Sequence, residues 1–378
     1  MRRISLTRAL AGLTALLILM APLALAEQAM TPESLLAQMT LRQKVGQLFL
    51  IRPEHLSLNS EKKRTGGGHT AVNDAMRRAY ADYPVGGFVL FAGNISDPKQ
   101  LKAFTRDLKS LGSIPSIVSV DEEGGRVLRV ASNEKFKIRK MVSMSEVGKT
   151  GDPENARKVG GYLGNYLREY GFNLDLAPVT DVRSNPKNSV IGNRAFSSDP
   201  QLVSRMVASF IEGMHGQRVR TCLKHFPGHG GTAGDTHAGY VALEKTWDEL
   251  LQLELIPFID NLAAADVIML GHISLPNVTD DGLPASLSKQ IITDRLRGEL
   301  GYQGLVTTDA LEMGAITKTY TSAEAAVLAL DAGVDLLMMP AYLPGAFDGV
   351  VEAVQDGRIP EARLDESVLR ILRMKMNQ

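Results

Sequence analysis

Short apolar runs alternate with helical stretches along most of this chain, and the alternation predicts an α/β fold. Most of the runs are nearly continuous in hydrophobic residues, as parallel strands buried on both faces require. We expect eight strands, over residues 45–51, 87–91, 116–120, 172–179, 219–223, 266–270, 304–308 and 334–339.

The stretches between these runs carry helix-start signals. Asp or Thr followed by Pro opens several of them, and this pair suits a helix N-terminus because the side chain caps backbone N–H groups while proline needs none. Eight strands alternating with helices predict a (β/α)8 TIM-type barrel in a single domain, with a doubly wound open sheet as the alternative. Helices are expected from residues 32, 98, 153 and 200 onward, and over 71–80 and 246–262.

The first 26 residues are typical of a targeting segment and not of a folded domain. Three arginines among the first eight residues precede an apolar run over 9–25, and Ala-Leu-Ala at 24–26 offers a cleavage site. We therefore expect export to the periplasm or the medium, with an uncleaved N-terminal anchor as the alternative. The barrel domain would then occupy residues 27–378.

Composition narrows the possible partners. Lys plus Arg and Asp plus Glu each number 42, so the chain is formally neutral. This balance gives no electrostatic reason to expect nucleic acid or a stable membrane partner. Cys222 is the one cysteine, so no intramolecular disulfide can form, and its place in an apolar run favours a buried structural thiol over a nucleophile.

Polar residues follow five consecutive predicted strands. In a barrel of this type the functional groups lie in the loops after the carboxyl ends of the strands. Each residue alone could be a helix cap or a surface ion pair, but together they predict one polar site at the barrel mouth. In chain order they are Asp121, Asp181 with Arg194, Lys224 with His225, His272 and Asp309.

The stretch KHFPGHGGTAGDTH at 224–237 holds three of the seven histidines. Asp235 and His237, two residues apart, could meet in a curled loop, where the carboxylate would hold the imidazole as a proton shuttle near neutral pH. Imidazole and carboxylate groups are also common zinc and iron ligands. These residues alone leave proton transfer and metal binding both open.

The same stretch resembles a known family signature. KHFPGHG followed by T-x-x-D-T-H is similar to the β-N-acetylhexosaminidase branch of glycoside hydrolase family 3. The likeness extends to VDEEGGRVLR at 120–129, IGNRAFSSDP at 191–200 and QGLVTTDALEMGAI at 303–316, and to a closing ARLDESVLRILRMK. It covers about residues 31–375.

The resemblance implies a retaining mechanism without metal or cofactor. Asp309 would be the nucleophile that forms a covalent glycosyl-enzyme, and His237, held by Asp235, would be the acid/base. The substrate would be an oligosaccharide ending in N-acetylglucosamine, such as a muropeptide or a chitin oligomer. No second domain carrying a glutamate acid/base is expected. The implied substrate contacts are Asp121, Arg129, Arg194, Lys224 and His225.

Some polar residues are not assigned to the implied chemistry. Glu122, Glu123 and Glu312 are interpreted as structural carboxylates. Residues 52–84, which are polar and glycine-rich, are interpreted as a surface insertion, with a lid over the barrel mouth as the alternative. A carboxylate at the place of Asp309 beside basic groups would stay ionised, as a glycosyl-accepting nucleophile must.

Three other functions remain open on these residues. A phosphorylase could use the same site on the same glycosides. A metal-dependent barrel hydrolase could use His225, His229, His237 and Asp309 as ligands. A non-catalytic binder of wall sugars is the alternative outside enzymology.

Overall fold

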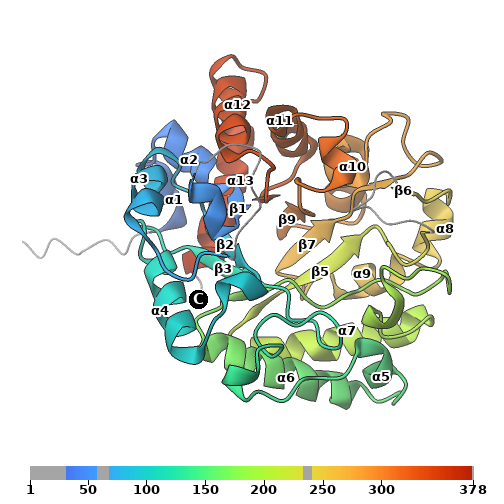
Figure 1. Ribbon diagram of the computed structural model, residues 1–378. Helices are drawn as coiled ribbons and strands as arrows, with labels where there is room; N and C mark the ends of the chain where they lie inside the picture. The colour runs from blue at the N-terminus through green and yellow to red at the C-terminus, as the bar shows by residue number, and fades with distance from the viewer. Residues whose placement is uncertain (1–30, 58–67, 233–240, 377–378) are drawn as a thin grey trace, which may run out of the picture.

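The computed structural model describes residues 31–57, 68–232 and 241–376, and these form a ring of parallel strands surrounded by helices (Figure 1). The eight strands of the main sheet follow the order β10-β1-β2-β3-β4-β5-β7-β9. A parallel bridge between Thr307 in β9 and Leu336, the residue before β10, joins the two ends of this order and closes the sheet. The closure confirms the TIM-type barrel. The strands are β1 Phe49–Ile51, β2 Gly87–Leu90, β3 Ile117–Val120, β4 Leu174–Asp175, β5 Arg220–Phe226, β7 Val267–Leu270, β9 Leu305–Thr308 and β10 Leu337–Met338.

The helices begin where the capping signals predict. The side chains of Asp97, Asp152 and Asp199 each accept a hydrogen bond from a backbone N–H in the first turn, with proline next in the chain. A short pair, β6 Val241–Ala242 and β8 Ile273–Ser274, lies beside the barrel. The helices are α1 Pro32–Leu36, α2 Leu41–Gln47, α3 Asp74–Asp82, α4 Pro98–Lys109, α5 Met144–Gly148, α6 Pro153–Glu169, α7 Pro200–His215, α8 Trp247–Leu251, α9 Ile256–Asn261, α10 Gly314–Thr317, α11 Ser322–Ala332, α12 Leu343–Gln355 and α13 Glu361–Met376, with a π-helix over Gln290–Glu299.

Several predicted elements differ in extent from the observed ones, and the local sequence explains two of these differences. The expected strand over 45–51 is helical up to Gln47, because Thr40 forms a capping box that starts α2 and the apolar residues also suit a helix face. The expected helix over 246–262 divides into α8 and α9, since Pro257 in the first turn of α9 cannot continue a helix from the preceding residues.

Helices α6 and α7 lie side by side on the outside of the barrel (Figure 1) and cross closely. A Cβ atom at Gly160 would lie 2.3 Å from the carbonyl oxygen of Phe210, and one at Gly213 would lie 2.2 Å from that of Arg157. Real Cβ atoms do not approach backbone so closely, so the two glycines allow the helices to pack directly on each other. Helix α7 also contacts β5, the strand that carries Lys224 and His225.

The core confirms the expectation for the thiol. Cys222 in β5 is completely buried, and burial raises the pKa of its thiol, so it is a poor nucleophile. No helix within the described residues is long and apolar enough to cross a bilayer. The predicted targeting segment lies outside the described residues.

One charged residue is buried at the amino ends of the strands. The Lys375 side chain of α13 donates to the Gln47 side-chain oxygen at 2.7 Å and to the Gly86 carbonyl at 2.6 Å. Burial lowers the pKa of Lys375 to about 7. These hydrogen bonds therefore hold α13 against the amino-terminal end of the barrel, opposite the carboxyl ends of the strands where the polar residues lie.

Candidate active site

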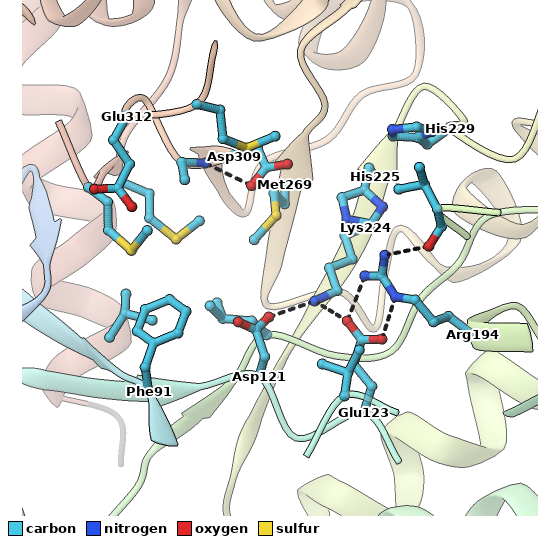
Figure 2. A pocket seen from close by; sticks show the side chains of 18 of the residues that line it. Phe91, Asp121, Glu123, Arg194, Lys224, His225, His229, Met269, Asp309 and Glu312 are labelled. Atoms are coloured by element: carbon cyan, nitrogen blue, oxygen red, sulfur yellow. Dashed lines mark hydrogen bonds and ion pairs between the residues drawn. The ribbon is translucent and has the colours of Figure 1, made fainter. Parts of the chain in front are cut away.

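A cavity of about 420 Å³ opens at the carboxyl ends of the strands. Its wall combines apolar side chains, including Phe91 and Met269, with a dense set of charged and imidazole groups (Figure 2). The charged and imidazole groups are Arg52, Asp121, Glu123, Arg129, Arg194, Lys224, His225, His229, Asp309 and Glu312.

Most of the predicted residues come together in this one cavity, whereas Asp181 and His272 lie behind its wall. Asp121, Arg129, Arg194, Lys224, His225 and Asp309 all line it. Lys224 and His225 lie within β5, which extends three residues beyond the predicted strand end and finishes at Phe226. Asp235 and His237, the predicted acid/base pair, lie outside the described residues. Within residues 31–57, 68–232 and 241–376, no three His, Cys, Asp or Glu side chains are grouped to hold a metal ion.

Lys224 connects two carboxylates on the cavity wall. Its ammonium lies 2.8 Å from Asp121 and 2.6 Å from Glu123, although it is only 2% exposed. Burial alone would lower the pKa of Lys224, but the two carboxylates outweigh it and raise that pKa. The lysine is therefore a fixed positive charge that can donate a hydrogen bond to a ligand.

Glu123 is held by a second cation. Arg194 donates through Nη2 and Nε to the two carboxylate oxygens at 2.7 and 2.8 Å, a bidentate arrangement seen in Figure 2. Burial would raise the pKa of Glu123, but Arg194 and Lys224 hold it well below its usual value. Glu123, interpreted as a structural carboxylate, lies on the cavity wall, where it holds both cations in place.

Glu122 behaves as expected of a structural residue. It is buried behind the cavity wall and accepts hydrogen bonds from the backbone N–H groups of Arg129, Val130 and Ala131 and from the Tyr166 hydroxyl. Burial nevertheless raises the pKa of Glu122 because these donors only partly offset the loss of water. Its role is to shape the loop that presents Arg129.

Two histidines are oriented by one buried carboxylate. Asp181 accepts from His225 Nδ1 at 2.8 Å and from the His229 backbone N–H at 2.6 Å. Burial would raise the pKa of Asp181, but the neighbouring His225 and His229 lower it below its usual value. Asp181 does not line the cavity. It acts by fixing the imidazole of His225, whose other nitrogen has no hydrogen-bond partner among the described residues.

Asp309 differs from the other three carboxylates of the wall. Asp121, Glu123 and Glu312 each form an ion pair with Lys or Arg, whereas Asp309 forms none with any described residue. Its Oδ1 accepts from the Ala310 backbone N–H at 2.7 Å. Burial would raise the pKa of Asp309, but His272, His225 and Lys224 keep it below its usual value. Asp309 is therefore an ionised carboxylate open to the cavity.

Three residues of the cavity wall, Arg52, Phe91 and Glu312, were missed or misread from the sequence. Arg52 directly follows β1 and packs 4.2 Å over the Phe91 ring, while its guanidinium lies 2.9 Å from Glu312. Glu312, interpreted as structural, thus lies on the cavity wall, three residues after Asp309. Arg52 directly follows a predicted strand, so the rule used for the other strand ends would have found it, whereas Phe91 is apolar and belongs to the predicted strand over 87–91.

The residues expected to form a surface insertion are not all remote from the site. Arg52, the first residue of the 52–84 segment, lines the cavity, and helix α3 Asp74–Asp82 packs with its buried side chains inward. Residues 58–67 lie outside the described part of the chain. The beginning of the segment therefore belongs to the site, and the described remainder packs on the barrel.

The arrangement has the chemistry of a site for a polyhydroxylated ligand. Carboxylates accept hydrogen bonds from hydroxyl groups, the guanidinium and ammonium groups donate to hydroxyl oxygens, and Phe91 and the methionines offer apolar contact. The loops at this face of a (β/α)8 barrel carry the chemistry, and a carboxylate without a cation partner among such groups is what the nucleophile of a glycosidase requires.

The chain belongs to glycosyl hydrolase family 3. The sequence profile described as "Glycosyl hydrolase family 3 N terminal domain" matches residues 40–374. A protein named beta-hexosaminidase from Stenotrophomonas maltophilia (strain R551-3) is 34% identical over 288 residues, covering 74% of this chain and 83% of that protein. The beta-hexosaminidase A of Pseudoalteromonas piscicida is 29% identical over 367 residues, which cover 89% of this chain.

A solved structure agrees in fold. The glycoside hydrolase family 3 β-N-acetylglucosaminidase from Paenibacillus sp. str. FPU-7 superposes with a TM-score of 0.82 at 35% identity, covering 89% of this chain. The present chain spans 62% of that structure and 61% of the Pseudoalteromonas relative. These similarities establish the family and the barrel.

Proposed function

We propose that this protein is a retaining β-N-acetylhexosaminidase that releases terminal, non-reducing N-acetylglucosamine. The observation that carries the proposal is Asp309, the one ionised carboxylate of the cavity wall with no cation partner among the described residues. A nucleophile attacks through a lone pair of electrons. A carboxylate held in an ion pair is the weaker nucleophile, because the cation already attracts that lone pair. The names of the relatives, beta-hexosaminidase and β-N-acetylglucosaminidase, support the choice of sugar.

The first step forms a covalent intermediate. A carboxylate oxygen of Asp309 attacks the anomeric carbon, and the bond between that carbon and the leaving oxygen breaks. His237, which would be held by Asp235, supplies the proton that the leaving oxygen takes up. The sugar is then an ester of Asp309 and the aglycone departs as an alcohol.

The second step returns the enzyme to its starting state. Neutral His237 removes a proton from water, the water oxygen attacks the anomeric carbon, and the bond to Asp309 breaks with its electron pair returning to the carboxylate. Two inversions give net retention of the β configuration. A histidine acid/base leaves no second carboxylate to repel an anion, so phosphate could replace water and yield the sugar 1-phosphate.

The remaining wall residues would bind the sugar. Asp121 would accept hydrogen bonds from hydroxyl groups while Lys224 and Arg194 donate to sugar oxygens, and Arg129 and His225 complete the set. The targeting segment favours an exported enzyme that meets cell-wall or chitin fragments. No cofactor or metal is part of the proposed mechanism.

The test uses two chromogenic substrates, 4-nitrophenyl β-N-acetylglucosaminide and the β-glucoside. Wild type should hydrolyse the acetamido sugar in preference to the glucoside, and Asp309→Ala should lose nearly all activity, with Asp331→Ala on the exposed face of α11 as the control. Undiminished turnover by Asp309→Ala would refute the proposal.

Two additions to the same assay separate the alternatives. Activity that a chelator abolishes and zinc restores would point to a metal-dependent hydrolase. Product analysis with and without phosphate distinguishes free sugar from sugar 1-phosphate. Binding of N-acetylglucosamine oligomers without any turnover would indicate a wall-sugar binder.

A further inference from the structure

His272 is a buried histidine next to the site that the proposed mechanism does not use. It follows β7 by two residues, is completely buried, and does not line the cavity. Its Nδ1 lies 2.7 Å from the Ser286 hydroxyl and its Nε2 lies 3.0 Å from the carbonyl oxygen of Ala310. A carbonyl oxygen only accepts hydrogen bonds, so Nε2 must carry the proton of this contact.

The acceptor of that bond belongs to the turn that carries Asp309. The Asp309 backbone N–H donates to the Leu270 carbonyl at 2.9 Å, which continues the pairing of β9 with β7. The next N–H, from Ala310, donates to the carboxylate of Asp309 itself at 2.7 Å. The orientation of the carboxylate therefore depends on where the backbone of Ala310 lies.

The C=O and N–H groups of the next peptide unit, between Ala310 and Leu311, both form hydrogen bonds. The Leu311 N–H donates to the Met338 carbonyl at 2.8 Å, and the Ala310 carbonyl accepts from the Met313 N–H at 3.0 Å as well as from His272. Within the described part of the chain, His272 is the side chain that contacts this peptide through a hydrogen bond. It joins the turn after β9 to the loop after β7.

We propose that His272 is a positioning residue for the nucleophile: through the carbonyl of Ala310 it holds the backbone whose N–H orients the carboxylate of Asp309. This inference rests on the proposed function, since it assigns no role if Asp309 is not the nucleophile. His272 also contributes electrostatically, because it is the group that most strongly opposes the effect of burial on the pKa of Asp309. His272 does not line the cavity, so we assign its effect on the reaction to the turn that carries Asp309.

Two substitutions separate the two nitrogens of His272. Glutamine places an amide N–H near the position of Nε2, so His272→Gln can still donate to the Ala310 carbonyl. Asparagine is shorter and places its amide near Nδ1, so His272→Asn can keep Ser286 and leaves the Ala310 carbonyl without this donor. Because a nucleophile misplaced by about 1 Å can cost about 100-fold in rate, His272→Asn should lose about that factor in kcat with KM nearly unchanged. His272→Gln should lose about tenfold or less in kcat, because its hydrogen bond to the Ala310 carbonyl is weakened but kept.

A chemical rescue distinguishes positioning from damage to the fold. In Asp309→Gly, azide can enter the vacated space, form a C–N bond to the anomeric carbon and release 4-nitrophenolate from the nitrophenyl glycoside. No carboxylate remains to be positioned in this background. Adding His272→Asn should therefore leave the azide-dependent rate within about twofold, while the same change in the wild-type background costs about 100-fold.

Each outcome decides one question. Equal losses for His272→Asn in both backgrounds, or equal losses for the Gln and Asn variants, would overturn the positioning role and make His272 a structural core residue. Failure of Asp309→Gly to be rescued by azide, or full activity of Asp309→Gly without azide, would instead refute the proposed nucleophile. The two failures are thus distinguishable in one set of measurements.

Discussion

Glu123→Gln is the substitution that best tests how the cavity wall is held. The change keeps the shape of the side chain and removes its charge. Glu123 is 2% exposed and contacts Lys224 at 2.6 Å and Arg194 at 2.7 and 2.8 Å. After the change Lys224 retains Asp121 at 2.8 Å, but Arg194 loses its only carboxylate among the described residues.

The expected loss in the free energy of unfolding follows from the burial of these charges. At an effective dielectric constant near 20, a cation about 4 Å from the carboxylate contributes about 4 kcal/mol of attraction. Desolvation of the buried ions offsets several kcal/mol of this attraction. Removing one partner still destabilises the protein by about 3–5 kcal/mol, because the other ion stays buried without a counter-charge. We expect about 3 kcal/mol for Glu123→Gln, at the low end, because Lys224 keeps one carboxylate.

The assay is urea unfolding with an exposed ion pair as the matched control. Lys102 and Glu169 lie 2.8 Å apart, about as close as the buried pair, but their side chains are 50% and 52% exposed. Glu169→Gln should therefore change the free energy of unfolding by less than about 1 kcal/mol. If the two variants lose the same stability, burial does not govern these pairs and the reasoning is wrong. Glu123→Gln should also raise KM, because both cations lose their orientation.

Two further predictions concern stability away from the charge network. The folded pKa of Lys375 is about 7 and its unfolded pKa is about 10.4, so the unfolded chain binds more protons between these values and stability should rise with pH across that window. The melting temperature of wild type relative to Lys375→Met should therefore increase from pH 7 to pH 9, and a constant difference would contradict the assigned pKa. A Cβ atom at Gly230 would lie 1.8 Å from the Val182 carbonyl oxygen, so Gly230→Ala should destabilise the protein by about 1–3 kcal/mol. Gly161→Ala in α6, where the nearest such atom is 3.8 Å away, should be neutral or stabilising by up to about 1 kcal/mol, and comparable losses in both would refute the steric argument.

Much of the site was predictable because it depends on local sequence order. The carboxyl ends of parallel strands meet at one end of a barrel, so a polar residue directly after an apolar run is expected there. This rule groups Asp121, Lys224 and Asp309 from the order of residues alone, and it applies equally to Arg52, which was overlooked. Helix starts were likewise local, since a capping side chain bonds within its own first turn.

Adjacent residues with the same chemistry could not be told apart in this way. Glu122 and Glu123 differ by one position, yet one shapes a loop and the other orients two cations on the cavity wall. His272 and Asp181 both follow strands, but they act behind the wall and not in it. Which way such a side chain points depends on the path of the loop, which no periodic pattern records.

Hydrophobic runs, helix caps and the KHFPGHG signature are properties of short segments, so the order of amino acids was enough to specify the alternation of strands and helices, the TIM-type barrel and the family. Which charges pair, and which carboxylate stays free, depends instead on the assembled barrel. Lys224 and Asp121 are 103 positions apart and meet because β3 and β5 lie on either side of β4 in the sheet. Asp309 is distinguished by the absence of a cation partner among the described residues, and this is a property of the whole wall that no short segment contains.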